Sequence, residues 1–177
     1  MRSRNPLLIT GFGPFLDIKE NPSGTLAQHL GHPFQILEVT YEAADQFWNE
    51  FDPAEYESVL LLGVAAKAQK LRIEHVAHNC CIEVRDVRGA RFGPEPIDPR
   101  LPSQLGATLW PAGIEDVHPD LEPSTDAGGY LCNYLLFRGL QLHSETRIGF
   151  LHVPPFEVVN MERQLDAVRA VIGRIEG

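Results

Sequence analysis

Short, largely apolar runs alternate along this chain with amphipathic segments, and no other feature constrains the fold as strongly. Such runs cover residues 7–10, 58–62 and 147–153. A run of this kind is typical of a strand buried on both faces, as the central strands of a parallel sheet are. Residues 42–51 and 161–175 instead place their apolar side chains on one face of a helix. Strands that alternate with helices predict βαβ units, and therefore an α/β fold built on a mainly parallel sheet.

Local signals mark where further elements begin and end. Asn21-Pro22 predicts a helix start, because asparagine caps the free amides and proline fits the first helical position. Gly31 is then expected to end that helix. The remaining segments are interpreted from their patterns as a strand at 34–40, extended ribbon at 71–85, a loop at 86–102, and helices at 101–110 and 129–143.

The size and charge of the chain limit what it can be. It has 177 residues, of which 44% are hydrophobic, enough for one buried core and too few for two ordinary domains. We therefore expect a single domain over residues 1–177. The formal net charge of −9 argues against a nucleic-acid partner, because binding to phosphate backbones is driven by clustered cations. The sequence shows neither a signal-peptide core nor a membrane span, so we expect a cytoplasmic protein with no membrane partner.

The cysteines predict neither a disulfide framework nor a metal site. Cys80, Cys81 and Cys132 are odd in number, and two of them are adjacent. Seven histidines are present, but neither Cys-x-x-Cys nor His-Glu-x-x-His spacing occurs. We expect no metal and no cofactor, and we interpret Cys80 and Cys81 as free thiols on a strand.

Cys132 is the strongest candidate for a nucleophile. It follows Gly128-Gly129 and falls in the first turn of a predicted helix. The positive end of a helix dipole stabilises a thiolate over a thiol. A nucleophilic cysteine also needs an imidazole and a group that orients it. The competing interpretation is a small core residue, which is what a lone buried cysteine usually is.

His152 and Glu74 are candidates for these two roles. His152 ends a predicted strand, so it faces the crevice at the carboxyl edge of the sheet, where the Cys132 helix also begins. Glu74 lies in a segment expected to be half buried, where a carboxylate needs a partner such as imidazolium. A core histidine and a surface carboxylate are the alternatives, and spacing alone does not decide between them.

Four segments together resemble the pyroglutamyl-peptidase I family of cysteine peptidases. They are Thr10–Phe15 with Asn21-Pro22, Gly63-Val64-Ala65 followed by Glu74, Asp126–Asn133, and Gly149–Pro154. They fall in the family's order and span nearly the whole chain. The resemblance implies a three-layer α/β/α sandwich with a mixed, mainly parallel sheet. It also implies removal of N-terminal 5-oxoproline (pyroglutamate) from peptides, and assembly into homodimers or homotetramers.

The resemblance further implies a role for each site residue. Cys132 would be the nucleophile, His152 the general acid and base, and Glu74 the group that holds the imidazole. The uncharged 5-oxoproline ring requires an apolar pocket with a few polar groups. The residues expected to form that pocket are Phe12, Phe15, Val64, Tyr130 and Leu131. For the two phenylalanines, simple packing of the loop on the sheet is the alternative.

The chain departs from the family pattern in several places, two of which concern arginines. Ala66-Lys67-Ala68 stands where members carry glycine, glycine and arginine. An arginine that members place about ten residues after the glutamate corresponds here to Arg85, with Arg88 and Arg91 as competitors. Two other functions therefore stay open. One is a catalytically weak or inactive relative that binds small cyclic or peptide ligands in the same pocket. The other is a different α/β hydrolase or nucleoside-processing enzyme, which the sequence disfavours because it shows no glycine-rich phosphate-binding motif.

Overall fold

The computed structural model describes residues 5–177. Its strands are β1 (Asn5–Phe12), β2 (Phe34–Leu37), β3 (Tyr56–Val64), β4 (Leu71–Glu74), β5 (Val76–His78), β6 (Gln104–Gly106), β7 (Leu121–Ser124) and β8 (Arg147–Val153). Its helices are α1 (Pro22–His29), α2 (Tyr41–Glu50), α3 (Leu131–Leu142) and α4 (Met161–Glu176), with a 3-10 turn η1 (Ile114–Val117). Within residues 5–177, none of the helices is long and apolar enough to cross a membrane.

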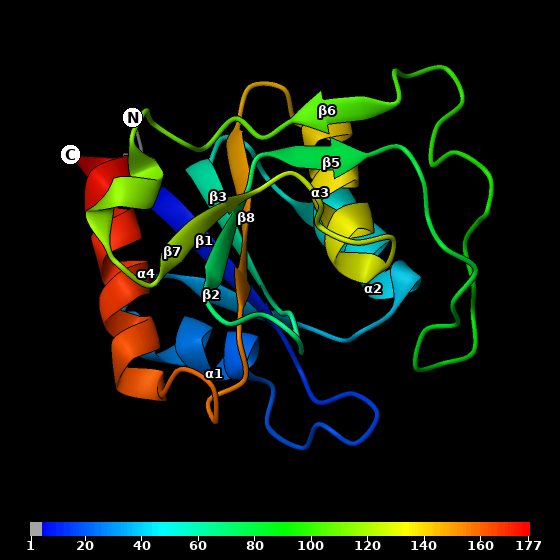
Figure 1. Ribbon diagram of the computed structural model, residues 1–177. Coiled ribbons are helices and arrows are strands. Elements are labelled where there is room, and N and C mark those ends of the chain that lie inside the picture. The colour runs from blue at the N-terminus through cyan, green and yellow to red at the C-terminus, as the bar shows by residue number, and fades with distance from the viewer. Residues whose placement is uncertain (1–4) are drawn as a thin grey trace.

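Most of the strands form one mixed sheet in the order β2-β1-β3-β8-β4-β7. The pairs β1–β2, β1–β3, β3–β8 and β4–β7 are parallel, whereas β4 and β8 are antiparallel. A separate ribbon of β5 and β6 lies beside α3, as Figure 1 shows. The mixed, mainly parallel sheet that the sequence predicts is confirmed.

Helices cover both faces of the sheet. Leu7 and Ile9 in β1 pack into a core with residues of α1 and α4, whereas Leu8 between them packs into a second core with residues of α2 and α3. Successive side chains of a strand point to opposite faces, so a continuous apolar run feeds both cores. Figure 1 shows α1 and α4 on one side of the sheet and α2 and α3 on the other. The expected three-layer sandwich is therefore confirmed.

The start of α1 follows the predicted capping pattern. Asn21 adopts an extended conformation and its side chain accepts a hydrogen bond from the amide of Ser23, with Pro22 at the first helical position. Gly31, just after the helix, has a φ of 76°, a conformation that glycine adopts without steric cost. The helix therefore starts and stops where the sequence indicates.

The prediction of a helix at 101–110 was wrong. Residues 104–106 instead form β6, which pairs with β5. The side-chain amide of Asn79 donates to the carbonyls of Leu101 and Pro102, and the amides of Thr108 and Leu109 donate to Ile148. Groups from elsewhere in the chain thus bond to the backbone carbonyls and amides that would otherwise form the hydrogen bonds of a helix.

The ribbon predicted over 71–85 is only partly correct. Residues 71–74 belong to the main sheet as β4, and only 76–78 enter the ribbon with β6. Cys80 and Cys81 lie beyond β5 in a loop, so their placement on a strand was wrong. All three cysteines, which lie within the described range, are free thiols, as expected. The short elements η1 and β7 had no predicted counterpart.

Candidate active site

Three elements bring Cys132, His152 and Glu74 to one place. Cys132 is the second residue of α3, His152 lies near the end of β8, and Glu74 ends β4. Strand β4 pairs directly with β8, which sets the carboxylate beside the imidazole. Sequence separation between the three is large, so the sheet topology alone makes them neighbours.

The imidazole of His152 is fixed by Glu74. Its Nδ1 lies 2.7 Å from Oε1 of Glu74, and the two residues are 6% and 0% exposed. The other carboxylate oxygen, Oε2, has no hydrogen-bond partner among residues 5–177. A buried carboxylate is costly unless it is paired, so His152 is the group that compensates this charge. Donation from Nδ1–H to Glu74 leaves Nε2 for the thiol of Cys132.

The surroundings of His152 favour its protonated form. Burial alone lowers the pKa of this imidazole, but the adjacent Cys132 thiolate and then the Glu74 carboxylate outweigh it and raise the pKa to about 9. The imidazolium form of His152 is therefore favoured beside the sulfur. A cation next to the sulfur stabilises a thiolate, which is the nucleophilic form of cysteine.

Gly63 makes room for the sulfur against the sheet. It lies in β3 directly opposite His152 in the register of β3 and β8. A Cβ at this position would lie 2.8 Å from Sγ of Cys132 and 2.6 Å from Cζ of Phe150, closer than real Cβ atoms come to such neighbours. Because Gly63 has no side chain, the sulfur of Cys132 can lie against β3, next to the strand β8 that carries His152.

The start of α3 leaves backbone donors next to the sulfur. Tyr130 precedes the helix in an extended conformation and makes no side-chain capping hydrogen bond. The first amides of a helix have no partner within the helix. Cys132 is the second residue of this helix, so these amides lie next to it in the chain and are candidates to stabilise a negative oxygen.

Asn133 ties the start of α3 to the end of β5 and the segment that follows it. Its fully buried side chain accepts a hydrogen bond from the amide of His78 at 2.8 Å. It also donates to the carbonyls of His78 and Cys80 at 2.8 and 3.0 Å. Sequence reasoning missed this role, although Asn133 stands next to Cys132 in one of the motifs that carry the family resemblance.

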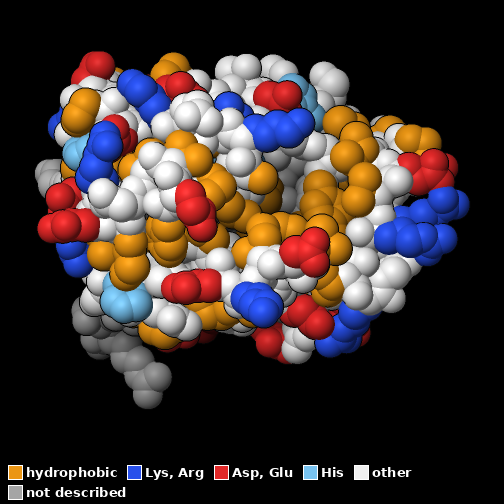
Figure 2. All heavy atoms as spheres, turned by 60° about the horizontal axis from the view of Figure 1, so that its bottom comes forward, with side chains coloured by type: hydrophobic (Ala, Val, Ile, Leu, Met, Phe, Trp, Pro, Cys, Tyr) orange, Lys and Arg blue, Asp and Glu red, His pale blue; other side chains and the backbone are white. Residues whose placement is uncertain are grey.

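An apolar hollow of about 70 Å³ opens beside Cys132. Its lining residues are Phe12, Phe15, Asn21, Val39, Val64, Tyr130, Leu131 and Cys132. Five of these are the residues that the sequence analysis expects around the substrate ring. In Figure 2, which brings the lower edge of Figure 1 forward, hydrophobic side chains gather around a hollow, with charged side chains both between and beyond them. The arrangement suits a small uncharged ring whose reactive carbonyl must reach the thiol.

Hydrogen bonds to α1 hold one wall of this hollow. The amide of Phe12 donates to Oγ of Ser23 at 3.0 Å, and the side-chain amide of Asn21 donates to the carbonyl of Gly13 at 3.1 Å. Gly11 permits this close contact, because a Cβ there would lie 2.4 Å from the carbonyl oxygen of Ser23. Asn21 therefore both caps α1 and lines the hollow, whereas the sequence analysis assigned it only the first role.

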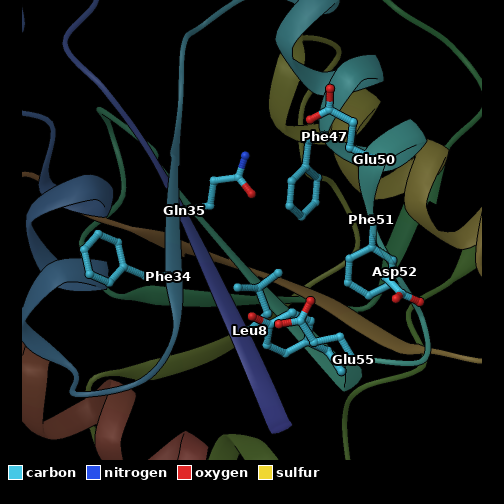
Figure 3. A pocket seen from close by; sticks show the side chains of 9 residues that line it. Leu8, Phe34, Gln35, Phe47, Glu50, Phe51, Asp52 and Glu55 are labelled. Atoms are coloured by element: carbon cyan, nitrogen blue, oxygen red, sulfur yellow. The ribbon is translucent and has the colours of Figure 1, made fainter. Parts of the chain in front are cut away.

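A larger hollow, of about 390 Å³, lies at the opposite ends of the strands from Cys132. It is formed where β2 and β3 begin and α2 ends, and Figure 3 shows Phe34, Phe47 and Phe51 around it with Glu50, Asp52 and Glu55. The residues that line it include no cysteine, histidine, serine or threonine. It offers no nucleophile, so the smaller hollow at Cys132 is the candidate active site.

Comparison of the sequence with protein families gives a match over nearly its whole length. The profile of the family described as pyroglutamyl peptidase matches residues 5–168. The chain belongs to the pyroglutamyl peptidase family. The family resemblance found in four segments of the sequence is therefore confirmed.

Relatives and solved structures of the pyroglutamyl peptidase family agree with this assignment. The pyrrolidone-carboxylate peptidase of Halalkalibacterium halodurans is 32% identical over 169 residues, which cover 85% of this chain and 84% of that protein. Pyroglutamyl-peptidase 1 of Homo sapiens is 26% identical over 200 residues, covering 96% and 88% of the two chains. The crystal structure of the pyrrolidone carboxyl peptidase from Thermus thermophilus has a TM-score of 0.83 at 32% identity and covers 95% of this chain and 99% of that one. The assignment to the cysteine exopeptidases is confirmed.

The departures from the pyroglutamyl peptidase pattern lie outside the hollow at Cys132. None of residues 66–68 lines it, and they form a turn in which the amide of Ala68 donates to the carbonyl of Ala65. The guanidinium of Arg85 donates to the carbonyl of Gly89 at 2.7 Å and does not line the hollow. A role for Arg85 at the site therefore stays a prediction.

The two competing arginines bind acidic side chains. Arg88 pairs with Glu38 at 2.6 Å and with Glu42 at 3.2 Å, and Arg91 pairs with Glu83. Neither lines the hollow at Cys132. Within residues 5–177, no group of three or more histidine, cysteine, aspartate or glutamate side chains is arranged to hold a metal ion.

Proposed function

We propose that this cysteine peptidase hydrolyses the bond after an N-terminal 5-oxoproline residue of peptides, with Cys132 as nucleophile, His152 as general acid and base, and Glu74 as the group that orients the imidazole. The observation that carries the proposal is the buried pair of Glu74 and His152 beside Cys132, at the edge of an apolar hollow. Nucleophile, imidazole and carboxylate in this arrangement are what acyl transfer through a covalent intermediate requires.

The reaction follows from the positions of these groups. The thiolate of Cys132 attacks the pyroglutamyl carbonyl, and the first amides of α3 stabilise the oxyanion of the tetrahedral intermediate. His152, already protonated, gives its proton to the departing amine as the carbon–nitrogen bond breaks, which leaves an acyl-enzyme. Neutral His152 then takes a proton from water, which attacks the thioester and releases 5-oxoproline. Glu74 holds the imidazole in one tautomer during both steps.

The apolar walls of the hollow select the ring. Burial of the 5-oxoproline ring against Phe12, Phe15 and Tyr130 removes apolar surface from water, whereas a charged amino terminus would lose its hydration there. Val64 at the end of β3 and Leu131 at the start of α3 complete the walls between which the lactam lies. Backbone groups at the end of β3 and at the start of α3 are the proposed partners for the lactam N–H and C=O.

The setting of the enzyme is part of the same proposal. We expect residues 1–177 to act as one catalytic domain on N-terminally pyroglutamylated peptides, without a cofactor and with no nucleic-acid or membrane partner. The cytoplasm is the proposed compartment, because a catalytic thiolate and two further free thiols persist in a reducing environment. Homodimers or homotetramers are the proposed assembly, as the family resemblance implies.

Release of a chromophore from a pyroglutamyl amide tests the proposal. Wild-type protein should release it, and Cys132→Ala should not, while its unfolding curve stays within error of the wild type. Cys80→Ala, which changes an exposed thiol, is the matched control and should keep full activity. Turnover by Cys132→Ala would rule out the mechanism. Binding of 5-oxoproline by a wild-type protein that hydrolyses nothing would favour the non-catalytic relative.

A further inference from the structure

A second hollow adjoins the candidate active site. It has a volume of about 360 Å³ and shares Val64 with the hollow at Cys132. Its walls come from residues 17–20 and Pro22, from the end of β3 and the residues after it, and from residues 155–157 after β8. Pro22 in the second hollow directly follows Asn21 in the first. The two hollows are therefore neighbouring parts of one surface.

The departing half of a substrate would lie on the side of the Cys132 sulfur that faces the second hollow. With the ring held beside Cys132, the nitrogen that leaves must be near His152, because His152 supplies its proton. His152 lies opposite Gly63, and the chain beyond each of these residues, Val64 to Ala66 and Pro155 to Glu157, forms a wall of the second hollow. A peptide that continues past His152 thus enters the second hollow.

The lining of the second hollow combines apolar surface with excess negative charge. Ile18, Val64 and Phe156 provide apolar surface. Asp17, Glu20 and Glu157 provide three carboxylates against the single ammonium of Lys19. Among the ion pairs within residues 5–177, none involves these four charged side chains. A lysine or arginine side chain fits this lining, because its stem packs on apolar groups while its charged end stays in water near the carboxylates.

We infer that the second hollow receives the residue immediately after the scissile bond, and that its carboxylates make the enzyme prefer peptides with lysine or arginine there over peptides with glutamate or aspartate. The inference rests on the proposed function, since it concerns the leaving half of the same substrates. The carboxylates are exposed, so the preference is moderate, about three- to tenfold in kcat/KM at low salt, and it declines as salt is added.

Competition between pyroglutamyl peptide amides tests the inference. The measured quantity is the ratio of kcat/KM for a peptide with lysine after the scissile bond to kcat/KM for the matched peptide with glutamate. Wild-type protein should give a ratio above about three. Glu157→Lys should bring the ratio to one or below, because it converts the excess of two negative charges in the hollow into balance. Glu145→Lys makes the same charge change at an exposed residue just before β8, at the opposite end of that strand from His152. It should leave the ratio unchanged.

Each other outcome overturns the inference in a recognisable way. Efficient hydrolysis of both peptides at equal rates overturns it and leaves the proposed function standing. The inference is also overturned, and the proposed function left standing, if the kcat/KM ratio is high but unaffected by Glu157→Lys, or if Glu145→Lys lowers that ratio equally. Failure to hydrolyse any pyroglutamyl substrate, the chromophoric amide included, overturns the proposed function and this inference together.

Discussion

Replacement of Gly63 by alanine should reduce activity sharply while the protein stays folded. The added Cβ would lie 2.8 Å from Sγ of Cys132, and ordinary contact begins at 3.4 Å, so the sulfur must retreat by about 0.6 Å. The ring of Phe150, 2.6 Å from the same Cβ, must move further still. Misplacement of a reacting atom by about 1 Å costs on the order of 10²-fold, so we expect kcat/KM to fall about 10- to 100-fold.

The accompanying loss of stability should leave the protein folded, because native domains have a free energy of unfolding of about 5–15 kcal/mol. Forcing one methyl group into a filled core costs about 1–3 kcal/mol. Chromophore release gives kcat/KM, the rate of Cys132 alkylation reports the position of the thiol, and urea unfolding gives the stability. Gly173→Ala is the matched control, because it adds the same methyl group in α4 where nothing lies within 4 Å. A Gly63→Ala protein with wild-type kcat/KM and wild-type alkylation rate would refute the placement of the sulfur.

Four further predictions concern the groups around the thiol. Glu74→Gln should lower kcat/KM about 10²- to 10⁴-fold and shift the alkaline limb of the pH profile to lower pH, because it removes a carboxylate that raises the pKa of His152. In the wild type, kcat/KM should fall as the pH rises through about 9, where His152 loses its proton. The stability that this protonation contributes should be complete below pH ~6.5, the unfolded pKa of histidine, and be lost as the pH rises through the raised folded pKa, which urea unfolding at several pH values measures. Asn133→Ala should lower the free energy of unfolding by about 2–4 kcal/mol, because it removes three hydrogen bonds and leaves partly buried backbone groups at His78 and Cys80 without these partners; an effect below 0.5 kcal/mol would contradict the proposed tie.

The sequence predicted those parts of the fold whose signals are local. Strands β1, β3 and β8 are buried on both faces, so an apolar run identifies each of them without knowledge of its neighbours. Helix α1 carries its start in Asn21-Pro22 and its end in Gly31. In each case the residues that determine the element lie within it or next to it.

Elements determined by distant partners were missed. Leu101, Leu105 and Leu109 recur at a spacing of four, which is typical of a helix, yet Asn79 and Ile148 take the backbone hydrogen bonds of this segment. Likewise β4 enters the sheet because β8 and β7 lie on either side of it, and its own four residues do not indicate this. Pairing partners far away in the sequence leave no local signal.

The candidate site shows the same division. Motifs identified Cys132, His152 and Glu74 one by one, whereas the 2.7 Å contact between imidazole and carboxylate depends on the pairing of β4 with β8. Val39 was read only as part of a strand, and it lines the hollow because the chain after β2 turns toward α3. The role of Arg85 at the site was predicted from motif alignment, which gives the position of a residue along the chain and not the direction of its side chain in space.

A crystal structure of Cys132→Ala with a pyroglutamyl peptide tests the central claim most directly. The ring should lie between Phe12 and Tyr130, with its reactive carbonyl carbon above residue 132 and the adjacent amide nitrogen facing Nε2 of His152. A ring bound elsewhere, or bound with that nitrogen directed away from His152, would contradict it.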